Sequence, residues 1–195
     1  MKMKNLFLII FFMPLTFLGQ NKISESARKF EIRELALPYL VKEVLSSGEG
    51  KVVSFTLDAL KGTASGELGT LFYSSDNNKS GLLFVFFNQK WVPDALFQKY
   101  SFLNMSSEKG VKLLNTLTRI EKKWRKNNNI LGKRQAERSI FFTVDDLLFV
   151  MDHGQGLSLG LNLRVYWGDY NSKWSFSSLS QTKKKLEKIL KKQLN

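Results

Sequence analysis

The residues of this chain best suited to chemistry are Asp145, Asp152 and His153, the last of which is its single histidine. An imidazole beside carboxylates is typical of a zinc site or of a general base oriented by an acid. A zinc site needs three or four ligands, and without cysteine the others would be carboxylates such as Asp146 or Asp169. We keep Asp145, Asp152 and His153 as candidates for a carboxylate-based hydrolase or nuclease, and we predict no metal and no cofactor.

Both acidic segments also have the composition of hairpin turns. The sequence Asp-His-Gly-Gln-Gly at 152–156 combines glycines with polar residues, as a reversal between two strands requires. Asp145-Asp146 separates two apolar runs, IFFTV and LLFVM, and aspartate is common in turns. We favour a turn at both positions, which would leave His153 at the rim of a sheet.

Other catalytic motifs give weaker signals. A single histidine restricts any serine-based triad to one base, and we expect no serine nucleophile. The segment KGTASGELGT at 61–70 lacks the spacing and the Lys-Ser or Lys-Thr pair of a P-loop, so we interpret it as a strand connection. We find no motif specific for nucleic acid.

The N-terminal residues have the composition of an export signal. Lys2 and Lys4 give a positive start, and an apolar stretch runs from Leu6 to Leu18. This stretch is shorter than the about 20 apolar residues that a spanning helix needs. We predict a protein exported to the periplasm or secreted, with an uncleaved N-terminal anchor as the alternative.

We expect residues 1–19 to be the signal peptide, with cleavage between Gly19 and Gln20. Residues 20–195 then form a single domain without a transmembrane span. The chain has no cysteine, which excludes disulfides, thiolate metal sites and a cysteine nucleophile. A domain of this length can build its core without disulfides.

The charge is strongly basic, with a formal net value of +13 that would fall to +11 on loss of Lys2 and Lys4. A field of this sign favours an anionic surface or an acidic partner outside the cytoplasm. A lysine-rich composition alone gives the same charge without function, so the partner is left open. The residues predicted to contact a polyanion are Lys122, Lys123, Arg125, Lys126, Lys133, Arg134, Lys183, Lys184, Lys185 and Lys188.

Helical spacing of apolar residues predicts three main helices. The first covers 23–50, with a kink at Pro38, which lacks a backbone N–H. The second begins at Ser106 or Ser107 and buries a stripe of Leu113, Leu117, Ile120 and Trp124. The third, over 180–195, is basic and buries Leu186, Ile189 and Leu190.

The remaining segments are predicted to be a short helix, a basic loop and several strands. A short helix is expected over 94–103, and residues 127–139 should form a mobile basic loop. Strands are expected over 51–60, on both sides of a turn at 74–80, over 139–152 and over 157–167. The run 82–87 is continuously apolar, which indicates a strand covered on both faces. Residues 157–167 alternate, which indicates one buried face.

The order of elements predicts an α+β domain. We expect a mainly antiparallel sheet of five to six strands, covered by N-terminal, central and C-terminal helices. The leading functional hypothesis is a non-catalytic domain that binds a ligand or partner. The alternatives are the carboxylate-based enzyme and a peripheral binder of anionic membrane or polyanion through the basic helices.

Overall fold

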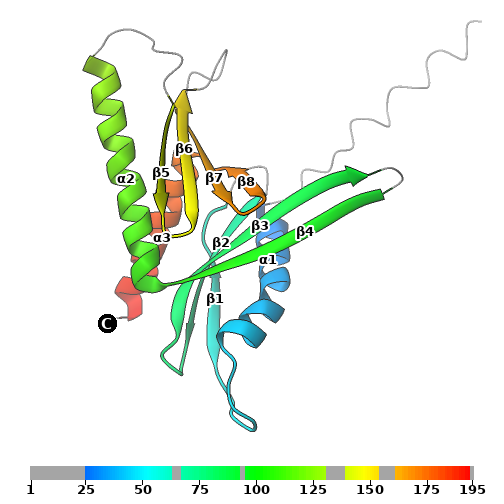
Figure 1. The fold of residues 1–195 in the computed structure, drawn as a ribbon. Helices are drawn as coiled ribbons and strands as arrows, with labels where there is room; N and C mark the ends of the chain where they lie inside the picture. Colours follow the sequence, from blue (N-terminus) through cyan, green and yellow to red (C-terminus); the bar gives the residue numbers. More distant parts are fainter. Residues whose placement is uncertain (1–24, 63–66, 93–94, 131–138, 154–160, 194–195) are drawn as a thin grey trace, which may run out of the picture.

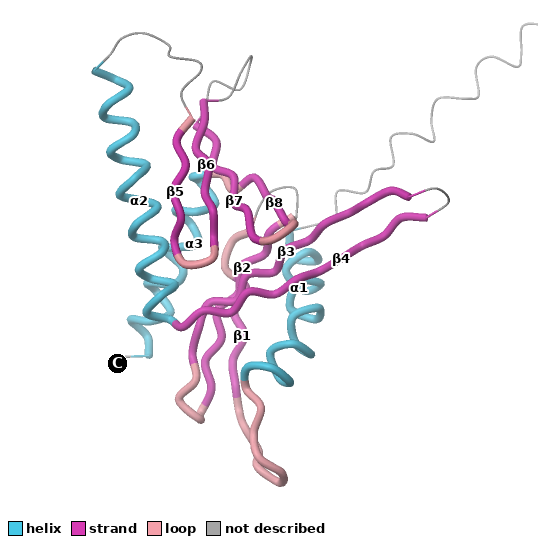
Figure 2. The backbone as a smooth tube through the Cα atoms, in the orientation of Figure 1, coloured by secondary structure: helices cyan, strands magenta, loops and turns pink. Residues whose placement is uncertain are grey.

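The computed structural model describes residues 25–62, 67–92, 95–130, 139–153 and 161–193 (Figures 1 and 2). These residues form three α-helices and two four-stranded antiparallel sheets, which confirms the predicted α+β class. The described strands number eight in two sheets, where five or six in one sheet were expected. The predicted signal peptide lies outside the described residues.

The first sheet, sheet A, has the strand order β1-β2-β3-β4. Its strands are β1 (Phe55–Ala59), β2 (Leu68–Ser75), β3 (Ser80–Val92) and β4 (Ala95–Ser106). β3 pairs with β4 along its length, from Gly81 to Val92, but with β2 only from Ser80 to Phe86. The far halves of β3 and β4 therefore extend from the sheet as a two-stranded ribbon (Figure 1).

Sheet A is buried on both faces, because consecutive residues of a strand point to opposite sides. On β3, Leu82, Phe84 and Phe86 belong to a core shared with the second sheet. Leu83 and Val85 belong to a separate core beneath α1 (Glu25–Tyr39). None of the five is more than 2% exposed. This confirms the prediction of a strand covered on both faces.

Helix α1 lies against the face of sheet A that points away from the second sheet (Figure 1). Ile32 of α1 approaches Gly69 of β2 so closely that a Cβ atom at Gly69 would lie 2.8 Å from the isoleucine Cγ2. Beyond Pro38 the helix widens into a π-helical turn, η1 (Leu40–Val44). The chain stays helical through Pro38, and the helical segment ends at Val44, six residues before its predicted end at Gly50.

The second sheet, sheet B, has the order β5-β6-β7-β8. Its strands are β5 (Ile140–Val144), β6 (Leu147–His153), β7 (Leu161–Trp167) and β8 (Tyr170–Lys173). The alternation predicted for 157–167 is confirmed in the middle of β7, where Leu163 and Val165 are buried and Arg164 is exposed. Residues 157–160 lie outside the described residues.

Helices α2 (Ser107–Ile130) and α3 (Phe176–Gln193) pack onto the core between the two sheets. The predicted stripes of both helices contribute to this core, from Leu113 to Trp124 in α2 and from Leu186 to Leu190 in α3. The predicted cap is present, since the Lys109 N–H donates to Ser106 Oγ at 3.3 Å.

Both helices are longer than predicted. α2 continues through 127–130, where the basic loop was expected to begin, because extending an existing helix costs little compared with starting one. α3 begins at Phe176, four residues before the predicted start, because Ser175 Oγ accepts the N–H of Ser178 at 3.1 Å and caps the helix.

Polar contacts to main-chain carbonyl groups fix the layers to each other. Thr182 Oγ1 of α3 donates to the Lys61 carbonyl oxygen at 2.6 Å, and Lys185 Nζ donates to that of Leu60 at 3.0 Å. Ser172 Oγ of β8 donates to the Glu67 carbonyl oxygen at 3.1 Å. These bonds attach α3 and sheet B to the residues that flank β1 and β2.

The short helix predicted over 94–103 was wrong, because residues 95–103 belong to strand β4. The segment has no helical start signal, and it contains Phe97, Tyr100 and Phe102, residue types that favour strands. Pairing with β3 supplies partners for the backbone along the whole segment.

Two conservative substitutions test this arrangement of the core. Phe86→Leu should lower the free energy of unfolding by about 1–2 kcal/mol, because Phe86 is fully buried against Trp167 and Tyr170 of sheet B. Phe141→Leu should change it by less than about 0.5 kcal/mol, because Phe141 is exposed. Urea denaturation followed by circular dichroism measures both; equal losses would contradict the assigned burial.

Candidate functional site

Asp145 and Asp146 form the turn between β5 and β6, as the sequence favoured. Val144 pairs with Leu147, so these two aspartates alone connect the strands. Asp145 has φ 49, in the left-handed region, which aspartate tolerates better than most side chains. The choice of residue is therefore explained by the backbone of the turn without a catalytic role.

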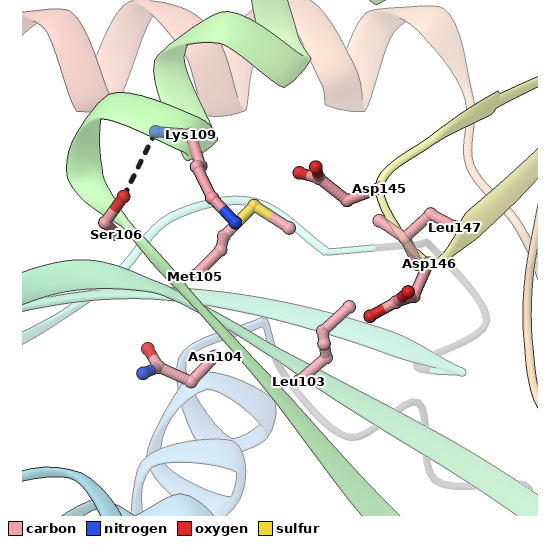
Figure 3. A pocket seen from close by; sticks show the side chains of 8 residues that line it. All are labelled: Leu103, Asn104, Met105, Ser106, Lys109, Asp145, Asp146 and Leu147. Carbon is pink, nitrogen blue, oxygen red and sulfur yellow. Dashed lines mark hydrogen bonds between the residues drawn. The ribbon is translucent and has the colours of Figure 1, made fainter.

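The turn borders a small cavity of about 260 Å³ at the start of α2 (Figure 3). Leu103, Met105 and Lys109 line the other side. In Figure 3 the Asp145 carboxylate points toward the start of α2, and the Asp146 carboxylate points toward Leu103, which also lines the cavity. Among the described contacts, no ion pair joins Lys109 to either aspartate.

Asn104 also borders the cavity, but its side chain lies on the opposite face of sheet A. Its Oδ1 accepts a hydrogen bond of 2.9 Å from Tyr73 Oη. Burial raises the pKa of the Tyr73 phenol, which keeps the hydroxyl protonated as the donor. Asn104 therefore holds the sheet together and offers the cavity no amide group.

The cavity is poorly suited to catalysis. Pockets that enclose a ligand usually measure about 300–1,000 Å³, and Asp145, Asp146 and Lys109 are all exposed to solvent. The two carboxylates point toward different parts of the cavity lining (Figure 3). A small polar molecule could contact Asp145 and Lys109 there without being shielded from water.

The three catalytic candidates lie at opposite ends of one strand. Asp145 is in the turn before β6, whereas Asp152 and His153 are its last two residues. Seven residues of extended chain span about 20 Å. The structure therefore brings Asp152 next to His153 along the backbone but does not bring Asp145 to them.

Asp152 is engaged by the neighbouring strand. Its Oδ1 accepts a hydrogen bond of 3.0 Å from Asn162 Nδ2, and its Oδ2 lies 3.9 Å from Arg164 Nε. His153 pairs with Leu161 across the hairpin, which places the histidine backbone at the rim of sheet B. The His153 side chain lies outside the described part of the chain.

The expectation of no serine nucleophile overlooked one match. Residues 156–160 read Gly-Leu-Ser-Leu-Gly, the pattern of a hydrolase nucleophile elbow, close to His153 in sequence. That elbow joins a strand to a helix, whereas here the described elements on either side are the antiparallel strands β6 and β7. The context required by the motif is not met, and residues 156–160 themselves are outside the described ranges.

The polyanion candidates fall into three groups. Lys133 and Arg134 lie outside the described residues. Three others are engaged: Arg125 with Glu121 at 2.9 Å, Lys183 with Glu187 at 3.8 Å, and Lys185 with a carbonyl oxygen. The remainder are exposed and have no ion pair among the described contacts, and these are Lys122, Lys123, Lys126, Lys184 and Lys188.

Helix α3 presents a lysine stripe that the sequence analysis identified only in part. Lys184, Lys188, Lys191 and Lys192 share one face at i, i+4, i+7 and i+8, and together with Glu187 they line a shallow surface hollow. The helical spacing of the last two lysines could have revealed them. The apolar side of α3 packs in the core between the two sheets, so the folded helix does not present that side to a membrane.

The second surface missed by sequence reasoning is the outer face of sheet B, the side opposite the core. Phe141 is 78% exposed there, and Leu148, Val150 and Tyr166 are half-buried beside it. The register places Phe141 opposite Val150, and Leu148 opposite Tyr166. The described elements therefore leave an apolar and aromatic patch in contact with solvent.

Two general features complete the description. Among the described residues, no group of three or more His, Cys, Asp or Glu side chains could hold a metal ion. No helix in the described ranges is long and apolar enough to cross a membrane. Comparisons with protein-family models, with curated proteins and with solved structures find no match to this chain.

Glycine substitutions test the assignment of the turn. Asp145→Gly should leave the free energy of unfolding unchanged or raise it by up to about 1 kcal/mol, because glycine adopts φ 49 without strain. Asp146→Gly should lower it by about 0.5–1 kcal/mol, because no left-handed backbone there offsets the added flexibility of the unfolded chain. Urea unfolding midpoints measure both, and the reverse order would refute a strained Asp145.

Proposed function

We propose that the protein is an exported, non-catalytic binding domain that contacts another protein through the outer face of sheet B. The observation that carries this proposal is the 78% exposure of Phe141 in a paired strand. Isolated apolar residues on a surface are common, but here half-buried Val150 lies directly opposite Phe141, and half-buried Leu148 and Tyr166 pair with each other in the next row of the same face. A contiguous patch of this kind is typical of a protein interaction site.

The energetics of the patch suit a binding surface. Fully burying a phenylalanine side chain is worth about 1.5–3 kcal/mol, so a partner covering Phe141 would gain on the order of 2 kcal/mol there. Aromatic residues in the centre of a patch commonly dominate interface energies. Phe141 and Tyr166 lie on strands, so little conformational entropy is lost when a partner contacts them.

A polar border adjoins the patch. Asp152, Asn162 and Arg164 form a connected group on the same face of β6 and β7. Interfaces usually combine an apolar centre with a hydrated polar rim. This arrangement supports the assignment of Asp152 to surface recognition or sheet stability instead of catalysis.

Export rests on the N-terminal sequence. Lys2 and Lys4 followed by the apolar residues from Leu6 to Leu18 have the pattern of a signal peptide. The partner would accordingly be an extracytoplasmic protein. The basic charge of the chain favours a partner that is acidic around its contact surface.

Site-specific photocrosslinking tests the proposed surface. With the full chain expressed in its native organism, p-benzoylphenylalanine at Phe141 should yield an adduct with a different protein on irradiation. The same group at Val52 should yield no such adduct, since Val52 is 92% exposed but lies in a loop far along the sequence from sheet B. Electrophoresis followed by mass spectrometry of the adducts provides the measurement.

Two serine substitutions test whether the Phe141 adduct depends on the other residues of the patch. Tyr166→Ser should reduce the Phe141 adduct severalfold, whereas Asn171→Ser, at the other edge of the same face, should leave it unchanged. Equal adducts from positions 141 and 52, or an adduct at 141 that contains only copies of this chain, would contradict the proposal.

A second candidate function is polyanion binding, favoured by the lysine stripe of α3. Four lysines on one helix face produce a local positive potential, and contacts of this kind weaken as salt rises. The stripe lies on the solvent side of α3, so it and the outer face of sheet B are separate surfaces.

Heparin chromatography tests this candidate. The triple variant Lys184→Gln, Lys188→Gln and Lys191→Gln should elute at a clearly lower salt concentration than the wild type, because it loses clustered charge. A triple variant with equal charge loss elsewhere, Lys42→Gln, Lys51→Gln and Lys173→Gln, should elute close to the wild type. Identical shifts for the two variants would show that only net charge matters and would remove α3 as a site.

A further inference from the structure

The edge strand β5 lacks the protection that the other sheet edges carry. Proteins usually place charged residues on edge strands, because an open edge can pair with another chain. The edges of sheet A contain Asp58 in β1 and Lys99 in β4, and β8 of sheet B contains Lys173. The sequence of β5, IFFTV, contains no charge and no proline. β5 is thus the one edge among the described strands that is open to pairing on this criterion.

The two-residue turn determines which backbone groups of β5 are free. In such a hairpin the closing pair, Val144 and Leu147, exchanges hydrogen bonds, and hydrogen-bonded pairs then alternate along the strands. Ile140, Phe142 and Val144 therefore direct their N–H and C=O groups toward β6. Phe141 and Thr143 direct theirs outward, and β5 has no other paired strand in the described part of the chain.

The backbone register of β5 defines how a second copy of the same strand would pair with this edge. Antiparallel pairing centred on Phe142 places Phe141 opposite Thr143 of the other copy, and the reverse. These are the residues with free backbone groups, so the pairing forms two hydrogen bonds at each of two positions. It brings no like charges together within β5, because the strand has none. At its ends, the Ser139 hydroxyl comes opposite the acceptor Asp145.

We propose that the protein forms a two-fold dimer in which β5 strands pair and join the two sheets B into one eight-stranded sheet. The contact is isologous, so it closes at two copies and leaves no further β5 edge open. It goes beyond the proposed binding function, because it needs no other protein. Its consequence for that function is that the two outer faces become continuous, with Phe141 of each copy near the centre.

The net charge of the chain opposes dimerisation, and the small contact limits its affinity. Two strongly basic chains repel each other, but at physiological salt exposed charges are screened beyond about 8 Å. A contact centred on one short strand is small, so we expect a dissociation constant on the order of 10 µM. Dimerisation should therefore strengthen as salt is raised, the opposite of what polyanion binding shows.

Light scattering coupled to size-exclusion chromatography tests the dimer with purified protein. At loading concentrations of about 100 µM the wild type should have a mean mass clearly above that of one chain, rising with concentration toward that of two, and Thr143→Lys should have the mass of one chain. Asn171→Lys is the matched control: it adds the same charge in the same cross-strand row, at the opposite edge of sheet B, and should remain dimeric. Circular dichroism checks that each variant is folded.

Spin labelling locates the contact. The chain has no cysteine, so Thr143→Cys gives a single attachment point at an exposed site. The proposed register brings the two Thr143 Cα atoms to about 9 Å, which should broaden the nitroxide spectrum at high protein concentration. A label at Asn171→Cys should show no broadening.

The outcomes are distinct. A single-chain mass for the wild type at about 200 µM would overturn the dimer while leaving the crosslinking test of the outer face unaffected. A dimer that persists in Thr143→Lys, or broadening at position 171 but not 143, would show that another surface mediates the contact. Loss of the dimer in Thr143→Lys alone, with broadening at 143, supports β5 pairing.

Discussion

The structure depends on one constraint: the middle of β3 must be buried on both sides at once. One side of β3 buries Leu82, Phe84 and Phe86 in the core between the two sheets. The other side buries Leu83 and Val85 in the core under α1. Consecutive residues of a strand point to opposite faces, so burial of one set fixes burial of the other. A register shift of one residue would move each set into the other core. The larger side chains face sheet B and the smaller ones face the helix, so the two cores are not interchangeable.

Double coverage of sheet A limits where the molecule can act. α1 takes one face of that sheet, and sheet B with α2 and α3 takes the other. Among the described residues, the surfaces left uncovered include the far side of sheet B and the backs of the basic helices. The proposed recognition through the outer face of sheet B is consistent with this arrangement.

Sequence patterns predicted the elements whose burial follows a simple period. The continuous run in β3, the alternation in β7 and the stripe of α2 are examples, because each pattern reflects a single packing environment. β4 was missed because its partner β3 stabilises it, and pairing is not visible in local spacing. Phe141 was missed for a related reason: IFFTV is apolar at consecutive positions, and the sequence alone does not show that Phe142 faces the core while Phe141 faces water. The turn at Asp145 was predicted, because its residue types are local signals.

The Asp145-Asp146 turn also influences events before the native state exists. Hairpins with such short connections close in about 1–10 μs, well before segments distant in the chain can meet. β6 is one of the most apolar segments, and it therefore pairs with β5 early in folding. The turn residues therefore favour early formation of the β5–β6 hairpin, in addition to setting the bend between these strands in the finished protein.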